Sequence, residues 1–173
     1  QGSAEKRAAM ADWMAAEKLD AAILSALDSV AWTFNVRGSD VERTPVALSF
    51  AIINGDGTAD LYVEPDKVDE AVRAHLGNAV RLHSRSAFAP ALEALKGKRV
   101  AVDPERAVSA IFERLKSGGA EIVETRDPSV LPRATKNVVE QAGHRAAQAR
   151  DGAAITRFLH WLSVEAPKGG ETE

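Results

Sequence analysis

Two charged side chains beside a short apolar segment are the first candidates for chemistry. Arg37 and Asp40 lie in the tetrapeptide Arg-Gly-Ser-Asp, which follows an apolar run that contains Trp32. Guanidinium and carboxylate groups form strong charge-assisted hydrogen bonds, either to a ligand or within a structural ion pair of the loop itself. Trp32 fits the wall of a binding site or, as is more common for a tryptophan with apolar neighbours, the core. The pattern predicts candidate binding residues and leaves these alternatives open.

The residue types needed for hydrolysis do not converge in the sequence. Ser39 has no visible His and Asp partners that would activate it, and the chain has no Cys. His144 and His160 are sixteen residues apart on one predicted helix, too far to share an ion. His75 and His83 would meet only through the fold. We therefore expect no catalytic residue and no metal site within these 173 residues.

The elements that must position these side chains alternate along the chain. Apolar runs predict strands over residues 21–25, 46–53, 59–63, 79–82, 99–102 and 120–123. Helical spacing predicts helices over residues 3–17, 68–76, 86–97, 104–118 and 137–162, with a short helical turn over residues 28–36. Asn54-Gly55 is a tight-turn signal, and Asp56 and Asp60, which flank it, are expected to serve the turn. This order predicts an α/β fold, a mixed sheet of about six strands with helices on both faces, plus a C-terminal helix.

Helix starts are predicted from residues that can cap an N-terminus. Ser3, Asp28 and Ser86 each carry a side-chain oxygen that can accept a bond from a free backbone N–H group. Asp103-Pro104 suits a further start, because proline is favoured at the first helical position. We therefore expect helices to begin at or directly after these positions.

A domain boundary is predicted where two prolines, at positions 128 and 132, interrupt the pattern, because neither suits a helix interior. We expect one domain over residues 1–133 and a second segment over residues 134–173. Asn137 with Glu140 three residues later forms a capping-box pattern, which predicts the start of a long helix. The apolar face of that helix has few partners in a chain of this length.

Composition limits the function classes. A net charge of −3 with both signs mixed does not favour binding to nucleic acid. No apolar run approaches the length of a membrane span, and the start does not match a signal peptide. The absence of Cys fits a reducing compartment, so we expect a cytoplasmic protein. Because the chain begins with Gln1 and not Met, we expect a piece of a longer protein.

Several stretches resemble one family. The sequence DSVAWTFNVRGSD (28–40), followed by TPVALSFAIINGDG (44–57), resembles the second domain of the three-domain Xaa-Pro aminopeptidases (aminopeptidase P) and, more broadly, the creatinase/prolidase amino-terminal domain. Further stretches resemble the opening of that domain, its exit, and the first helix of the pita-bread catalytic domain: SAEKR (3–7), LPRA (131–134) with KNVVE (136–140), and FLHWL (158–162). The resemblance covers nearly the whole chain.

The resemblance implies a sheet similar to that of ribonuclease H and a non-catalytic part of a metal-dependent Xaa-Pro aminopeptidase. Such enzymes remove the N-terminal residue before a penultimate proline, with two divalent metal ions, here expected to be manganese, held by two Asp, one His and two Glu of the catalytic domain. None of those ligand motifs is present in this chain. The resemblance further implies a homodimer and a peptide substrate with proline in second position. Arg37, Asp40 and Trp32 are then expected to bind substrate at the mouth of the active site.

Two other interpretations stay open. The chain is alternatively a stand-alone binding module that has the fold and lacks a catalytic domain. The parent enzyme is alternatively of the prolidase or creatinase type, although the Arg-Gly-Ser-Asp loop resembles aminopeptidase P more. In each case the chain alone is expected to be inactive as a peptidase.

Overall fold

The computed structural model describes residues 1–170 of the 173, so the last three residues of the expected second segment lie outside the described part. The chain divides into two compact units, Gln1–Arg133 and Ala134–Glu173. The first unit contains the sheet and the hydrophobic clusters that pack on it, and the second contains one long helix.

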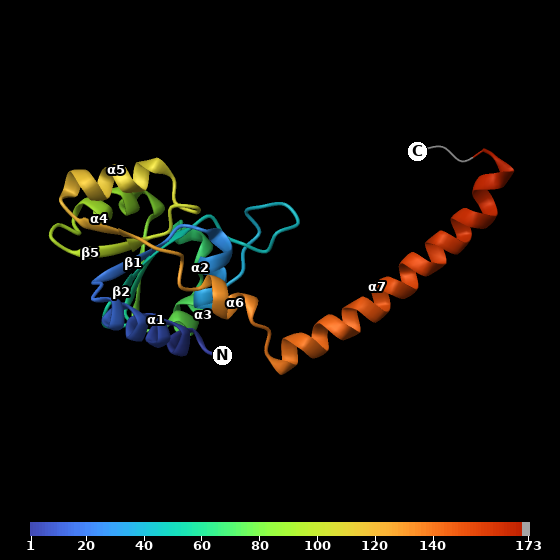
Figure 1. The fold of residues 1–173 in the computed structure, drawn as a ribbon, viewed down its shortest axis with the longest axis horizontal. Coiled ribbons are helices and arrows are strands. Elements are labelled where there is room, and N and C mark those ends of the chain that lie inside the picture. Colours follow the sequence, from blue (N-terminus) through green and yellow to red (C-terminus); the bar gives the residue numbers. More distant parts are fainter. Residues whose placement is uncertain (171–173) are drawn as a thin grey trace. The chain divides into compact units, whose positions relative to one another are not determined.

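A six-stranded mixed sheet forms the centre of the first unit, as predicted (Figure 1). The strands are β1 (Ala21–Leu24), β2 (Phe50–Asn54), β3 (Ala59–Tyr62), β4 (Val80–His83), β5 (Arg99–Val102) and β6 (Glu121–Glu124), in the order β4-β3-β2-β1-β5-β6. β2 runs antiparallel to both neighbours, and the other pairings are parallel. The carboxyl ends of the five parallel strands therefore meet at one edge of the sheet.

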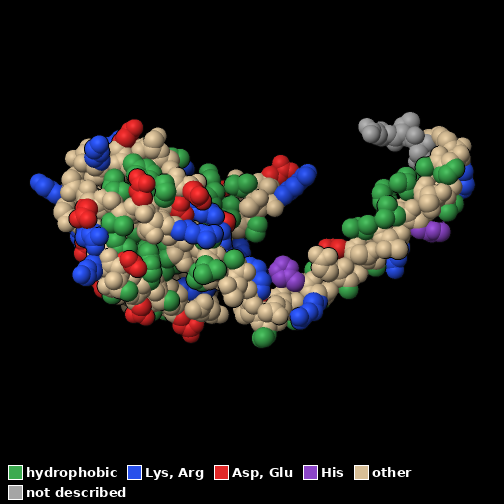
Figure 2. All heavy atoms as spheres, in the orientation of Figure 1, with side chains coloured by type: hydrophobic (Ala, Val, Ile, Leu, Met, Phe, Trp, Pro, Cys, Tyr) green, Lys and Arg blue, Asp and Glu red, His purple; other side chains and the backbone are tan. Residues whose placement is uncertain are grey.

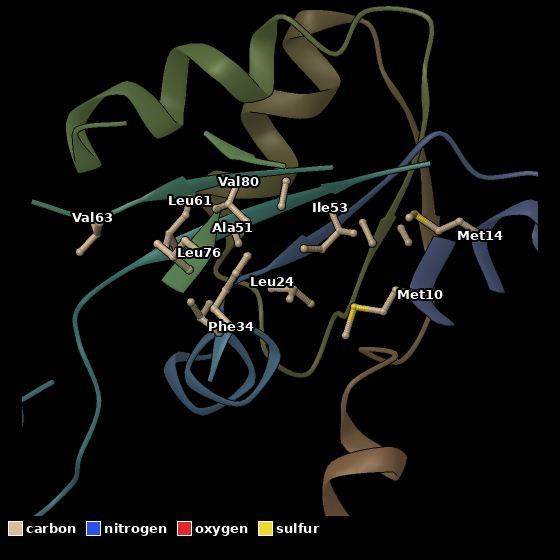
Figure 3. Packing of buried hydrophobic residues seen from close by; sticks show 14 of the residues in the cluster. Met10, Met14, Leu24, Phe34, Ala51, Ile53, Leu61, Val63, Leu76 and Val80 are labelled. Carbon is tan, nitrogen blue, oxygen red and sulfur yellow. The ribbon is translucent and has the colours of Figure 1, made fainter. Parts of the chain in front are cut away.

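Helices cover both faces of this sheet (Figure 1). On one face lie α1 (Ser3–Glu17), α2 (Leu27–Phe34) and α3 (Glu70–Leu76), and on the other α4 (Phe88–Glu93) and α5 (Ser109–Gly118). Alternate side chains of β1 serve the two faces: Leu24 packs with Met14 and Phe34 in the first cluster (Figure 3), and Ile23 belongs to the second. A strand that is buried on both faces must be apolar throughout, which is why the central strands show no polar alternation.

Two of the expected N-caps are wrong, although the helices themselves form. α2 begins at Leu27 after Ala26, which provides no side-chain bond, and the Asp28 carboxylate instead accepts the Ser29 N–H at 2.9 Å. Asp28 is the second residue of α2 and therefore not its N-cap, and its carboxylate also pairs with Arg133. α1 begins at Ser3 itself, and the Ser3 hydroxyl accepts a hydrogen bond from Arg7.

Three further boundaries differ from the sequence prediction. α5 begins at Ser109 and not at position 104, because the buried Asp103 carboxylate accepts the backbone N–H groups of Glu105 and Asp127 and holds a turn there. Ser86 lies inside the 3₁₀ turn Arg85–Ala87, and α4 follows it directly. β2 begins at Phe50, four residues later than expected, because residues 46–49 form part of a loop that bonds to Asp40.

The C-terminal elements follow the end of the sheet. A short helix, α6 (Val130–Ala134), was not predicted, and its proline at position 132 lies in the first turn, where a missing N–H costs little. α7 (Val138–Glu165) has Asn137 as its N-cap: the Asn137 side chain accepts the Glu140 N–H, and the Glu140 carboxylate accepts the Asn137 N–H. This confirms the predicted capping box. A 3₁₀ turn, Ala166–Lys168, follows. Among the described helices, none is both long enough and apolar enough to cross a membrane.

Candidate binding sites

The loop between α2 and β2 borders an open hollow of about 760 Å³, which we call the first hollow. Its buried apolar lining includes Leu61, Val63 and Leu76, from β3, the residue after it, and α3. The remaining lining residues are Asn35, Val36, Arg37, Gly38, Ser39, Asp40, Ala47, Ser49, Lys67, Val68, Asp69, Ala71, Val72 and His75. The hollow thus combines an apolar interior with charged side chains, the mixture that is typical of ligand sites.

Arg37 is exposed and fixed at one end only. Its Nη1 donates hydrogen bonds to the carbonyl oxygens of Val36 at 2.9 Å and Ala31 at 3.3 Å, close to the C-terminus of α2. The Ala31 carbonyl also accepts the Val36 N–H at 3.1 Å, so the guanidinium joins the hydrogen bonds that cap the end of α2. A guanidinium has five N–H donors, and those on Nε and Nη2 make no hydrogen bond within residues 1–170. The cation is therefore held in place with one edge available to a ligand.

Asp40 holds the loop together. Its Oδ2 accepts hydrogen bonds from Lys67 Nζ and from the Leu48 N–H, each at 2.7 Å, and its side chain is 17% exposed. The Lys67 ammonium and the Leu48 amide lower the pKa of the Asp40 carboxyl below its usual value. Asp40 therefore pairs with Lys67 and not with Arg37, and it fastens the loop to the turn before α3. The ion pair that the sequence suggested for this loop is therefore present, but its cation is Lys67 and not Arg37.

Trp32 does not line the same hollow as Arg37 and Asp40. It lines a second hollow of about 460 Å³, bordered by α1, α2 and residues 125–132. Its lining residues are Gln1, Lys6, Ala9, Met10, Trp13, Trp32, Thr125, Arg126, Asp127, Pro128, Leu131 and Pro132. The three predicted binding residues therefore divide between two places, because successive side chains of α2 and of the loop after it point in different directions.

A cluster around Asp60 was missed in the sequence, where Asp60 was assigned to turn chemistry. Asp60 lies on β3, and its carboxylate accepts hydrogen bonds from Arg81 at 2.6 and 2.7 Å, from His83 at 2.7 Å and from Asn54 at 3.2 Å. Burial alone would raise the pKa of Asp60, but these hydrogen bonds outweigh it and lower the pKa to about 2. The Asp60 carboxylate is thus ionised at neutral pH and is a poor proton acceptor, which fits a structural role. Arg81 and His83 come from the parallel neighbour β4, more than 20 positions away, and Asn54 ends the antiparallel neighbour β2, so no local pattern in the sequence indicates the cluster.

Ion pairs also occupy the carboxyl ends of β1 and β5. Asp28 pairs with Arg133 and lies 3.9 Å from Arg106, which in turn lies 3.6 Å from Asp103. Arginine cations thus neutralise the carboxylates that an ion would need. No group of three or more His, Cys, Asp or Glu side chains among residues 1–170 is placed to hold a metal ion.

A model of the creatinase/prolidase N-terminal domain matches residues 1–140. The chain belongs to this family. A protein named as Xaa-Pro aminopeptidase P in Aspergillus flavus is 39% identical over 151 residues, which cover 83% of this chain and 23% of that protein. The creatinase/prolidase assignment therefore agrees with the resemblance seen in the sequence.

Solved structures of peptidases share the fold of this creatinase/prolidase domain. The X-prolyl aminopeptidase of Caenorhabditis elegans, described as a cytosolic enzyme with a di-nuclear active site, matches with a TM-score of 0.84 at 26% identity, over 98% of this chain and 28% of that one. The Xaa-Pro dipeptidase of Bacillus anthracis matches with a TM-score of 0.72 over 92% of this chain and 44% of that one; at 15% identity, it shows the fold alone. The chain spans about a quarter of the length of the aminopeptidases that it matches.

Proposed function

We propose that this chain is the non-catalytic N-terminal module of a metal-dependent Xaa-Pro aminopeptidase, and that its first hollow lies at the mouth of the active site. The observation that carries the proposal is the extent of the similarity. Aminopeptidases P match 83–93% of this chain at 34–39% identity, although the chain spans only 23–27% of their length. In this proposal the remaining length supplies the catalytic domain, which removes the N-terminal residue before a penultimate proline.

Arg37 is the residue of the first hollow that we assign to the peptide substrate. Its Nη1 is anchored to the end of α2, so the cation loses little further freedom when it binds. The edge formed by Nε and Nη2 has the geometry that binds a carboxylate through two parallel hydrogen bonds. A peptide's C-terminal carboxylate is the ligand that best fits this edge. We assign Asp40 to the support of the loop and, through Ser39 and the loop backbone, to the shape of the hollow.

The exposed apolar face of α7 supports the proposal of a missing domain. Ile155, Phe158, Leu159 and Leu162 follow helical spacing and are 58%, 55%, 56% and 38% exposed. Figure 2 shows hydrophobic side chains along the C-terminal part of α7. An exposed apolar stripe of this kind is typical of an interaction surface, and we propose that the catalytic domain packs against it. Two divalent metal ions, manganese by analogy, would bind in that domain, and a cytoplasmic homodimer is part of the same proposal.

Kinetics of the full-length enzyme test this assignment. Arg37→Ala should lower kcat/KM for an Xaa-Pro peptide with a free C-terminal carboxylate by on the order of tenfold, because a charge-assisted bidentate contact is lost. Arg37→Lys keeps a cation for the end of α2 but lacks the paired edge, so it should keep the melting temperature and still lose turnover. The same peptide with an amidated C-terminus should show a much smaller dependence on Arg37.

Arg43→Ala is the matched control. Arg43 belongs to the same loop, is 90% exposed and does not line the first hollow, so its removal should leave turnover unchanged. Unchanged kinetics in both Arg37 variants would show that the loop has only a structural role.

The coding sequence downstream of Glu173 separates the proposal from the stand-alone binding module. An open frame with the Asp, Asp, His, Glu and Glu ligands supports the peptidase, and a stop codon supports the module.

A further inference from the structure

The first hollow has an apolar wall that the function proposed above leaves unassigned. Leu61, Val63 and Leu76 line the hollow, are at most 6% exposed and belong to the first hydrophobic cluster (Figure 3). The buried Val68, just before α3, and the half-buried Val72, within α3, line it as well. We call these five residues the apolar wall. Their side chains present only carbon atoms to a ligand, and core packing holds them in place.

The carboxylates of the first hollow are bonded to donors of the protein itself. Asp40 accepts from Lys67 Nζ at 2.7 Å, and Asp69 is the N-cap of α3, where it accepts the Val72 N–H at 2.8 Å. A carboxylate at a helix N-terminus is also stabilised by the partial positive charge of the helix end. Arg37 has no such counterpart, because its guanidinium forms no ion pair within residues 1–170. This unpaired cation favours a ligand with a negative charge.

The other polar side chains of the hollow are largely engaged as well. His75 Nε2 donates to the carbonyl oxygen of the last residue of α2 at 3.0 Å, and Ser49 Oγ donates to a loop carbonyl oxygen at 3.0 Å. Asn35 bonds to two residues of the N-terminal segment. Ser39 makes no side-chain hydrogen bond within residues 1–170, and it is exposed. The hollow therefore offers few free hydrogen-bonding groups besides the free edge of Arg37.

We propose that the first hollow binds the C-terminal residue of a peptide and selects an apolar side chain at that position. A C-terminal residue carries its main-chain carboxylate and its side chain on the same carbon, so it can contact Arg37 and the apolar wall together. A polar side chain against this wall would lose its water with few free partners in exchange. A branched apolar side chain, such as that of leucine, gains free energy there because the burial of apolar area is favourable. The volume of about 760 Å³ lies within the range of sites that hold small ligands.

This inference rests on the proposed function, because it takes a peptide as the ligand of the first hollow, but the two can fail separately. If the isolated chain selects leucine over glutamine while Arg37 has no effect on turnover by the full-length enzyme, the proposed function fails and the binding site stands. If Arg37 variants lose turnover while peptides that end in leucine and in glutamine behave alike, this inference fails and the proposed function stands.

Nuclear magnetic resonance of the ¹⁵N-labelled 173-residue chain tests the inference with small ligands. N-acetyl-leucine carries both features, and its amide lacks the carboxylate. N-acetylglycine lacks the side chain, and N-acetylglutamine has a polar side chain in its place. N-acetyl-leucine should shift the amide signals of the lining residues with saturation. It should bind on the order of tenfold more tightly than each of the other ligands, the effect of one buried apolar side chain or one charge-assisted contact.

Substitutions separate the charge from the wall. Arg37→Ala should lower the affinity for N-acetyl-leucine to that for its amide. Val72→Thr keeps the shape of a half-buried side chain and places a hydroxyl in the apolar wall. It should weaken the binding of N-acetyl-leucine roughly three- to tenfold and leave that of N-acetylglycine unchanged, a difference that a merely structural role would not produce. Val108→Thr is the matched control, because Val108 is 64% exposed and does not line the hollow, so all affinities should stay the same.

Several results would overturn the proposal. These are the absence of a saturable shift with N-acetyl-leucine, equal affinities for N-acetyl-leucine and N-acetylglutamine, and equal affinities for N-acetyl-leucine and its amide. Shifts that spread over the whole domain and do not centre on the lining residues would show non-specific binding and overturn it too.

Discussion

At the scale of single residues, Asp60 shows how hydrogen bonds override burial. Its side chain is only 15% exposed, which by itself would favour the neutral acid. Arg81, His83 and Asn54 all approach the carboxylate, and the pKa falls to about 2. The folded state therefore binds this proton more weakly than the unfolded state, in which an Asp has a pKa near 3.9. Stability from Asp60 is present above about pH 4 and is lost as the pH falls toward 2.

Asp60→Asn should lower the free energy of unfolding by about 2 kcal/mol at pH 7, the value that corresponds to the pKa shift. The difference from the unmodified chain should shrink as the pH falls from about 4 to about 2, because the native carboxylate is then protonated as well. Denaturant unfolding at a series of pH values measures both. Asp66→Asn, an exposed position without an ion pair in the described part of the chain, should show neither effect. A pH-independent difference would mean that Asp60 acts by packing and not by charge.

At the scale of elements, the loop after α2 depends on one close contact. A Cβ atom placed on Gly38 would lie 2.7 Å from the Ala47 Cβ and 2.8 Å from the Ala47 Cα. Two backbone segments of the loop therefore touch at Gly38, and this contact brings Arg37 and Asp40 to the first hollow. The requirement for glycine comes from this lack of space, since Gly38 is not among the residues with positive φ.

Gly38→Ala should therefore destabilise the first unit by about 1–3 kcal/mol, the usual cost of forcing an extra methyl group into a packed site. Thermal unfolding followed by circular dichroism measures it. Gly143→Ala is the control, because nothing lies within 4 Å of a Cβ at Gly143 in α7. That substitution should strengthen the helix by about 1 kcal/mol, since alanine has the higher helix propensity. An unchanged melting temperature for Gly38→Ala would show that the loop can open at this point without cost.

The sequence predicts elements better than it predicts their meeting points. The six strands, the hairpin after Asn54 and the capping box at Asn137 depend on neighbours within a few residues, and they are confirmed, although β2 begins at Phe50 and the left-handed residue of the hairpin is Gly57 and not Gly55. The predicted start of α5 was wrong because the Asp103 carboxylate accepts the backbone N–H of Asp127, 24 positions away, and no local pattern reveals this bond. The contacts of the candidate site residues depend on distant parts of the chain in the same way.

The candidate site shows this limit most clearly. Arg37 and Asp40 were identifiable as polar residues in a loop, but their partners Ala31, Leu48 and Lys67 were not. The apolar lining of the first hollow comes from β3 and α3. Both elements are predictable from the sequence, but the sequence does not show that they lie beside this loop. The association of Trp32 with α1 likewise needs the packing of two helices that are separate in sequence.

At the scale of the whole molecule, both hydrophobic clusters lie within the unit Gln1–Arg133. No residue of α7 is buried. The hydrophobic core of the sheet unit is therefore made by that unit's own side chains. The long helix has its capping box as a local source of stability, and a single helix in water is otherwise marginal.

A chain that ends after Lys136 should keep the cooperative thermal unfolding of the full chain. Its melting temperature should change by less than about 2 °C, which corresponds to roughly 0.5 kcal/mol for a domain of this size. The helical circular dichroism signal should fall, because the 28 residues of α7 are absent. Deletion of residues 1–17 is the contrasting variant: it removes Met10 and Met14 from the first cluster and should abolish cooperative unfolding. Loss of the cooperative transition in the shorter chain would show that α7 contributes to the sheet unit, and the cover proposed for its apolar face would then have to be that unit and not a catalytic domain.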